Sequence, residues 1–128
     1  MSKDHFNALR AFGATKAANL MFTFELARRA KRWDVRAYAY HPGLVRSDLM
    51  REAPRPIRLL TRLVSRAPRR AGEDLAELAT SPAFESTTGW FLKGGRRIDP
   101  PKSTLDVEAQ RNLWTRSAEL VEIGETGF

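Results

Sequence analysis

The sequence predicts an α/β domain whose strands pair in parallel. Two short stretches rich in aromatic residues end at proline or glycine, and the first of them also alternates, whereas the longer stretches around them have helical spacing. The resulting order is helix, strand, helix, helix, strand, helix. Strands that alternate with helices favour a parallel sheet, but two strands are too few for a stable one. We therefore expect the chain to be part of a larger sheet domain.

The composition excludes several classes of protein and of functional site. The 128 residues carry 22 Lys and Arg against 15 Asp and Glu, a formal net charge of +7, and no cysteine. The missing cysteine excludes a disulfide scaffold, a thiolate metal site and a cysteine nucleophile. No apolar run reaches the roughly 20 residues that cross a bilayer, and the first ten residues lack the apolar core of a signal peptide. We expect one domain at most, soluble and cytoplasmic.

The first helix is expected to begin after about Leu9 and to be largely buried, because apolar residues lie on most of its surface. One face of this helix is made of small residues that would let another backbone approach closely: Ala14, Ala17 and Ala18. The basic residues at its C-terminal end complement the helix dipole: Arg28, Arg29, Lys31 and Arg32. The stretch Val35–His41 alternates and contains two tyrosines, which predicts a strand. Pro42 and Gly43 mark where it stops.

Residues 51–70 contain seven arginines and three prolines, and a short amphipathic helix is expected from about Ile57 to Arg66. Arginines recur there every three or four residues: Arg51, Arg55, Arg58, Arg62, Arg66 and Arg69. Such a stripe is interpreted as a solvated outer face, with binding to phosphates or an anionic membrane as the alternative. Prolines interrupt the stripe and no stacking aromatics accompany it, which favours the solvated face.

A third helix is predicted from Pro68 to the Ser81-Pro82 stop. Its expected inner face is Ala71, Leu75, Leu78 and Ala79, and the acids expected in its first turns are Glu73, Asp74 and Glu77. The second strand is predicted over residues 89–93, closed by Gly94-Gly95. A final helix follows Asp99-Pro100-Pro101, with Ser103 and Asp106 as a capping box and an apolar face of Leu113, Trp114, Leu120 and Val121.

The order of these segments resembles a known family. Phe12-Gly-Ala-Thr-Lys16 opens a long helix, the next strand ends in His41-Pro-Gly-Leu-Val-Arg-Ser47, and Leu78-Ala-Thr-Ser-Pro82 and Gly89-Trp-Phe-Leu follow. Together they resemble the C-terminal half of short-chain dehydrogenase/reductases, in the retinol-dehydrogenase-like branch. The resemblance implies that residues 1–128 are the substrate-side half of a doubly wound, Rossmann-like parallel-sheet domain, with its N-terminal half absent. Residues 51–70 would be its Arg-rich, substrate-covering segment.

The resemblance also implies site residues. The family opens its long helix with Tyr-x-x-x-Lys, where the lysine holds the cofactor ribose and lowers the pKa of the tyrosine phenol, which exchanges a proton with the substrate. Phe12 stands at the tyrosine position and cannot do this, whereas Lys16 is retained. Without the resemblance, Phe12 would be a core aromatic and Lys16 a solvated helix lysine.

The segment after the strand is implied to contact the nicotinamide through Pro42, Gly43, Val45 and Ser47. Ser47 replaces the usual threonine and keeps its hydroxyl. Without the resemblance, the segment would be an ordinary turn that ends a strand. His41 is expected to be structural, because no motif places a carboxylate or serine with it. No metal site is expected.

The family's Gly-rich cofactor motif and catalytic serine are not in this sequence, and Gly94-Gly95 leads to no helix that would hold a phosphate. We therefore expect a truncated or degenerate relative of oxidoreductases acting on lipophilic alcohols or carbonyls, inactive as this chain alone. NAD or NADP is the implied cofactor, not tightly bound by this chain. The alternative is a non-catalytic association module that pairs with a second copy or with the missing half. A weaker third alternative is a basic module that associates with nucleic acid.

Overall fold

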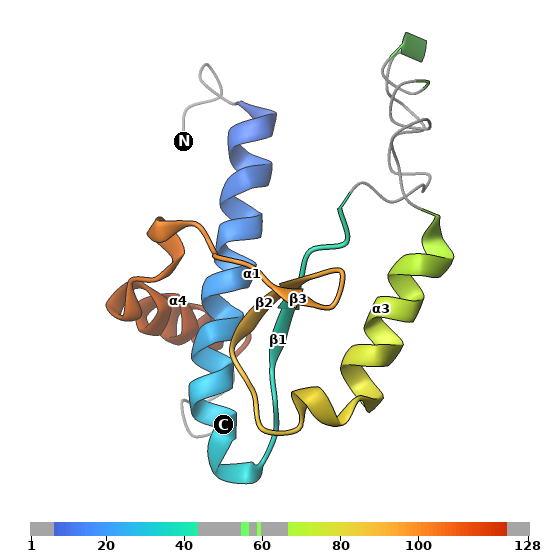
Figure 1. Ribbon diagram of the computed structural model, residues 1–128. Helices are drawn as coiled ribbons and strands as arrows, with labels where there is room; N and C mark the ends of the chain where they lie inside the picture. The colour runs from blue at the N-terminus through green and yellow to red at the C-terminus, as the bar shows by residue number, and fades with distance from the viewer. Residues whose placement is uncertain (1–6, 44–54, 57–58, 60–66, 123–128) are drawn as a thin grey trace. The chain divides into compact units, whose positions relative to one another are not determined.

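The computed structural model describes residues 7–43, 55–56, 59 and 67–122, apart from the side chain of Ala8 (Figure 1). Within these residues the chain is a mixed α/β segment, as predicted. Its elements are α1 (Ala8–Ala30), β1 (Tyr38–Tyr40), α3 (Pro68–Thr80), β2 (Trp90–Lys93), β3 (Arg96–Arg97) and α4 (Val107–Leu120). The chain divides into two compact units. The described residues of the first lie in 1–39, 87–91 and 98–128, and those of the second in 40–86 and 92–97.

Helix α1 begins and ends as its sequence indicates. The side chain of Asn7 caps the helix by accepting the backbone N–H of Arg10 at 2.9 Å. Arg28 and Arg29 occupy the last turn, where cations complement the helix dipole. A 3₁₀ turn over Lys31–Trp33 follows, and Asp34 ends it in the left-handed region with φ 56°.

The expectation that α1 is largely buried is wrong for its first half. Leu9 is 80% exposed and Phe12 55% exposed, whereas Leu20, Phe24 and Ala27 farther along the helix are buried. The contacts that α4 makes with α1 lie in the second half of α1: Trp114 contacts Phe22 and Arg29, and Gln110 accepts a hydrogen bond from Arg28. The small face of Ala14, Ala17 and Ala18 is accordingly exposed or half-buried.

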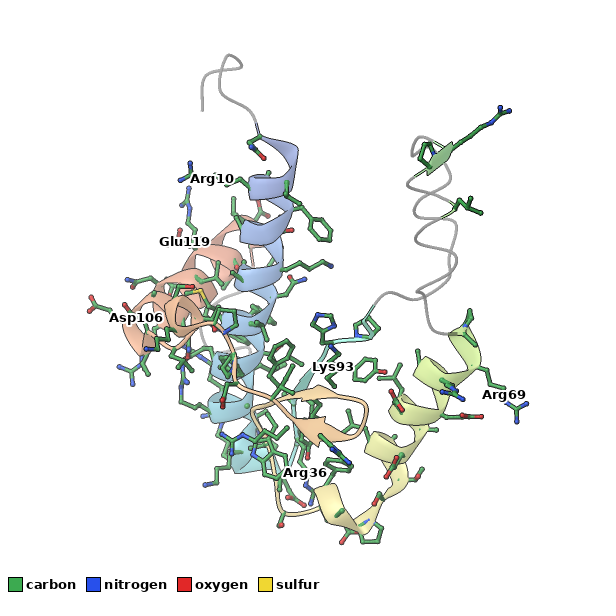
Figure 2. All side chains as sticks on the ribbon, turned by 45° about the horizontal axis from the view of Figure 1, so that its top comes forward. Arg10, Arg36, Arg69, Lys93, Asp106 and Glu119 are labelled. Atoms are coloured by element: carbon green, nitrogen blue, oxygen red, sulfur yellow. The ribbon has the colours of Figure 1, made fainter. Side chains whose placement is uncertain are left out.

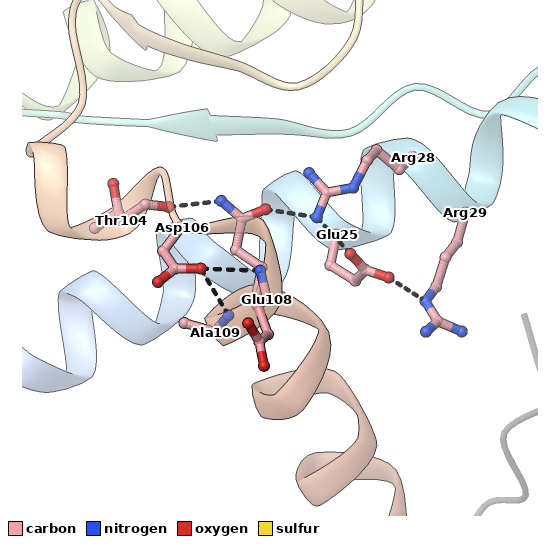
Figure 3. Close-up of polar contacts among 8 residues, drawn as sticks. Glu25, Arg28, Arg29, Thr104, Asp106, Glu108 and Ala109 are labelled. Atoms are coloured by element: carbon pink, nitrogen blue, oxygen red, sulfur yellow. Dashed lines mark hydrogen bonds and ion pairs between the residues drawn. The ribbon is translucent and has the colours of Figure 1, made fainter.

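The predicted capping box of the last helix, α4, is wrong. Asp106 is itself the N-cap, and its carboxylate accepts the backbone N–H groups of Glu108 and Ala109 at 2.9 and 3.1 Å (Figure 3). Ser103 lies one element earlier, in the 3₁₀ turn Lys102–Thr104, so it cannot cap α4. Of the predicted apolar face, Trp114 is buried and Leu113 half-buried. Leu120 and Val121, at the far end of the helix, are exposed.

The sheet has the order β1-β2-β3. Between β1 and β2, the N–H of Gly89 donates to the carbonyl of Ala37 at 2.8 Å and the N–H of His41 donates to that of Leu92 at 2.7 Å. These bonds advance in the same direction along both segments, which is the pattern of parallel strands. The predicted strands at 35–41 and 89–93 are therefore present, although each is shorter than expected.

Strand β3 was not predicted. It pairs with β2 in the antiparallel sense, with Leu92 opposite Arg97 and Lys93 opposite Arg96. Gly94 and Gly95 form the two-residue turn between them with φ 55° and 72°. Positive φ at both turn residues is the type I′ geometry that suits a tight hairpin and favours glycine. The Gly94-Gly95 pair thus reverses the chain.

Gly89 permits a close approach inside the first unit. Its φ is 69°, and a Cβ added there would lie 3.3 Å from the Cβ of Ala27 on α1. Both the backbone conformation and the short distance disfavour any side chain at this position. The helix and the segment leading into β2 therefore meet through an alanine and a glycine.

Helix α3 in the second unit begins at Pro68 and ends before Ser81, as predicted. None of residues 68–80 is buried. Ala71 and Leu78 of the predicted inner face are half-buried, but Leu75 and Ala79 are exposed. The predicted preceding helix, from about Ile57 to Arg66, lies outside the described residues except for Leu59, which is helical and exposed.

Candidate functional site

Phe12 and Lys16 lie on one face of α1, as residues four apart in a helix must. The Nζ of Lys16 is 5.3 Å from the centroid of the Phe12 ring, within the range of a cation–π contact. Both side chains are exposed. The arrangement presents an ammonium group able to donate hydrogen bonds beside a ring that has no proton to exchange.

The Pro42–Gly43 segment leaves β1 as a tight turn. The N–H of Gly43 donates to Nδ1 of His41 at 2.8 Å, and Gly43 has φ 72°. The N–H of His41 is anchored on the carbonyl of Leu92 at 2.7 Å. The predicted site residues Val45 and Ser47 lie outside the described residues.

The structure thus brings the predicted site residues together in two separate groups. Phe12 and Lys16 belong to the first unit, and Pro42 and Gly43 belong to the second. Each group has a defined local geometry. Their union in one site stays a prediction.

Sequence reasoning missed a polar pair next to this turn. The phenol of Tyr40 donates to Oδ2 of Asp74 on α3 at 2.6 Å. The sequence predicts Asp74, with Glu73 and Glu77, in the first turns of the helix, where acids complement the dipole. Because α3 begins at Pro68, its first turn contains no acid, and Asp74 is half-buried against β1. The alternation of Tyr38 and Tyr40 predicts a strand but does not identify this partner.

A second polar group joins α1 to α4 within the first unit (Figure 3). Glu25 is buried and accepts hydrogen bonds from Arg28 and from Nε of Arg29, the latter at 2.7 Å. Arg28 also donates to the amide oxygen of Gln110, whose Nε2 donates to the carbonyl of Thr104 at 2.6 Å. Burial raises the pKa of Glu25, but the bonds from Arg29 and Arg28 outweigh it and hold this pKa below the ordinary 4.5. These groups satisfy one another, so the cluster is structural.

The arginine stripe falls mostly outside the described residues, which include Arg55 and Arg69 but not Arg51, Arg58, Arg62 or Arg66. Arg69 extends from the start of α3 (Figure 2), with its Nε 2.9 Å from Glu73. Its side chain is exposed, as expected for a solvated face. Lys93, Arg96 and Arg97 of the hairpin are exposed cations too.

Two further searches concern the described part of the chain. No three His, Asp or Glu side chains there are grouped so that they could hold a metal ion. None of the helices there has the length and apolar character required to span a membrane.

Curated proteins match the chain over nearly its whole length. It is 35% identical over 121 residues to dehydrogenase/reductase SDR family member 13 of Homo sapiens, which covers 91% of this chain and 32% of that protein. It is 31% identical over 128 residues to retinol dehydrogenase 14 of Mus musculus, covering 95% and 38% respectively. It is 34% identical over 126 residues to retinol dehydrogenase 12 of Homo sapiens, covering 95% and 39%. No family model matches.

These matches define the class: the chain is a homologous segment of the short-chain dehydrogenase/reductase family. Within that family its relatives include the retinol dehydrogenases, so the retinol-dehydrogenase-like branch indicated by the sequence is confirmed. The chain spans between about a third and two fifths of the length of these relatives. The mixed α/β fold with its small sheet agrees with part of a Rossmann-like domain.

Proposed function

We propose that residues 1–128 are the substrate-side segment of an NAD(P)-dependent short-chain oxidoreductase for lipophilic alcohols or carbonyls, and that this segment alone is inactive. The observation that carries the proposal is the position of Lys16 on one face of α1 with Phe12, in a chain related to dehydrogenases over nine tenths of its length. Retinol, named in several relatives, illustrates the substrate class. Residues 51–70 would cover the substrate, and the expected cytoplasmic location is part of the same proposal.

The chemistry of Lys16 and Gly43 suits a nicotinamide cofactor. The ammonium of Lys16 can donate hydrogen bonds to the ribose hydroxyls, and Gly43 has no side chain to obstruct a flat ring. Pro42, Val45 and Ser47 would extend this contact along the nicotinamide. When bound, NAD or NADP supplies or accepts the hydride. This segment alone offers few of the contacts of a whole domain, so its affinity is expected to be low.

Phe12 is the reason to expect no turnover. A phenyl ring neither donates nor accepts the proton that must move with the hydride, so the acid/base group is missing at this position. The purified chain should give no change in NADH or NADPH absorbance with retinal-like or steroid-like carbonyls. Phe12→Tyr alone should not restore activity, because the phenol would still lack its partner serine and the cofactor domain. Measurable turnover by the wild-type chain would contradict the proposal.

Cofactor contact is tested separately from turnover. In an isotope-labelled sample, NADH or NADPH at millimolar concentration should shift the NMR signals of Lys16 and Gly43, and Lys16→Met should weaken that response. Arg10→Met is the matched control, because Arg10 is another exposed cation on α1. Equal responses of the two variants would remove Lys16 from the cofactor site.

A specific observation supports an association module as the second candidate. The first half of α1 exposes Leu9 and Phe12, an apolar surface suited to a second copy or to the complementary part of a dehydrogenase domain. Sedimentation of the chain should then show a concentration-dependent dimer that Leu9→Ser weakens. A monomer at all concentrations would reject self-association. The nucleic-acid alternative rests on the arginine stripe alone and predicts duplex binding that falls steeply with salt.

A further inference from the structure

The turn after β1 is closed by an imidazole. The N–H of Gly43 donates to Nδ1 of His41 at 2.8 Å, a side-chain acceptor two residues before the donor. Asparagine and aspartate make the same pattern in Asx-turns, where a side-chain oxygen accepts the N–H two residues on. His41 therefore does here what a short polar side chain does elsewhere.

The backbone on either side of this bond limits how the turn can be held. Before it, the strand end is fixed by the bond from the His41 N–H to the carbonyl of Leu92 and by the Tyr40–Asp74 bond. After it, Gly43 has φ 72°, in a region that the backbone enters readily only at glycine. Glycine also has the most conformational freedom to lose, so the imidazole bond favours this conformation of the Pro42–Gly43 turn.

We propose that His41 is a positioning residue for the Pro42–Gly43 turn, and that protonation of its imidazole releases the turn. In the neutral ring one nitrogen accepts and the other carries the proton, so acceptance at Nδ1 requires the proton on Nε2. When a solvent proton adds to Nδ1, both nitrogens become donors and the N–H of Gly43 faces another N–H. Because the turn is the nicotinamide-contacting segment of the proposed function, the inference rests on that proposal for its meaning in catalysis.

The protonation of His41 takes place near charged groups on β2, β3 and α3, the elements around this strand end. Asp74 on α3 accepts a hydrogen bond from the phenol of Tyr40. The charged residues of these elements are Lys93 at the end of β2 (Figure 2), Arg96 and Arg97 in β3, and Arg69, Arg70, Glu73, Asp74 and Glu77 in α3. His41 itself is exposed, so its ring exchanges protons directly with the solvent. Histidine is the side chain that ordinarily changes charge between about pH 5 and pH 8, so the proposal is tested over that range.

The test is an NMR titration of the whole isotope-labelled chain between about pH 5 and about pH 8. At the basic end, the ring signals of His41 should show an unprotonated Nδ1 and a protonated Nε2. As the ring takes up its proton, the Gly43 amide signal should move in step with it. Exchange of the Gly43 amide proton, corrected for its intrinsic pH dependence, should rise about fivefold, the loss expected for one hydrogen bond.

Two variants separate positioning from mere packing. His41→Asn supplies an oxygen that does not titrate, so it should keep the Gly43 amide protected and constant at every pH. His41→Leu should leave that amide unprotected at every pH. His5→Asn is the matched control, because it removes the other histidine and should leave the wild-type response intact. A Gly43 amide that ignores the ring titration, or that still titrates in His41→Asn, would overturn the proposal.

Failure of the proposed function would look different. The titration needs no cofactor, so a coupled His41–Gly43 response supports the positioning role even if NADH produces no shift at any pH. In that case the turn is positioned by His41 and the cofactor role of the turn is rejected. If NADH does bind, its affinity for the wild-type chain should fall at acid pH, whereas that of His41→Asn should fall less.

Discussion

Helices α3 and α4 are nearly equal in length, with 13 and 14 residues, but they are held in different ways. Helix α4 buries Trp114, whose ring stacks on Phe22 at 4.8 Å and lies under the guanidinium of Arg29 at 4.8 Å. It also buries Gln110, which bonds to Arg28. Helix α3 buries no residue, and its Asp74 accepts a hydrogen bond from the phenol of Tyr40.

The difference shows that a helical pattern and the stability of the helix are separate properties. Both segments carry good starts, a proline at the first position of α3 and an aspartate cap on α4. Isolated helices of this length are marginal in water, so stability must come from packing. We therefore expect α4 to open only when the first unit unfolds, and α3 to open more easily through local fluctuations.

Trp114→Ala should have the largest effect of the changes considered. It removes a buried indole and its contacts with Phe22 and Arg29, a loss of about 3 to 5 kcal/mol in the free energy of unfolding. Urea unfolding followed by circular dichroism measures it. The control is Trp33→Ala, since Trp33 is 48% exposed against 7% for Trp114. Equal losses in the two variants would refute the view that α4 is held by this ring.

Glu25→Gln should have an intermediate and pH-dependent effect. At neutral pH it removes the carboxylate that Arg28 and Arg29 share, at a cost of about 2 kcal/mol once the exposure of Arg28 is considered. Because the folded pKa of Glu25 lies below 4.5, its stabilisation is complete above about pH 4.5 and is lost as the pH falls through the folded pKa.

The melting temperatures of wild type and Glu25→Gln should therefore differ clearly at pH 7 and converge in acid below the folded pKa. Glu119→Gln is the matched control, because Glu119 pairs with Arg116 on the exposed side of α4. Its melting temperature should stay close to that of the wild type throughout. A gap for Glu25→Gln that widens on acidification would show that the sign of the effect is wrong.

Tyr40→Phe should have the smallest effect, confined to the second unit. It deletes one hydrogen bond to Asp74, worth about 1 kcal/mol. Hydrogen exchange should become faster for the amides of α3 and stay unchanged for those of α4. Tyr38→Phe is the control, because the phenol of Tyr38 bonds to Thr87 within the first unit. Faster exchange in α3 after that control would argue against a specific Tyr40–Asp74 tie.

The sequence predicted those parts of the fold that are decided locally. Pro68 and Ser81-Pro82 mark both ends of α3 because proline acts on its own neighbourhood. Ser103 misled the capping prediction, since a 3₁₀ turn intervenes before Asp106. The exposed first half of α1 was missed because apolar spacing does not say how far along α1 its partner helix reaches.

In the candidate site, too, the sequence predicted the local features and missed those that depend on distant residues. The shared face of Phe12 and Lys16 follows from their spacing of four, and the structure has it. The partner of Asp74 lies 34 residues away at Tyr40, a contact that depends on how the chain returns and that no spacing rule supplies. The bond between His41 and Gly43 is local and could have been anticipated from the Asx-turn pattern, had histidine been considered as its acceptor.

The contact between Gly89 and Ala27 has a consequence for how sequences of this kind diverge. A Cβ at position 89 would meet the Cβ of Ala27 at 3.3 Å, and φ 69° disfavours it further. We therefore expect the two positions to be linked in evolution: a side chain at 89 requires a different backbone conformation there and a small shift of Ala27. Alignments of close relatives should show glycine at 89 wherever 27 holds alanine, with paired substitutions marking a shifted helix.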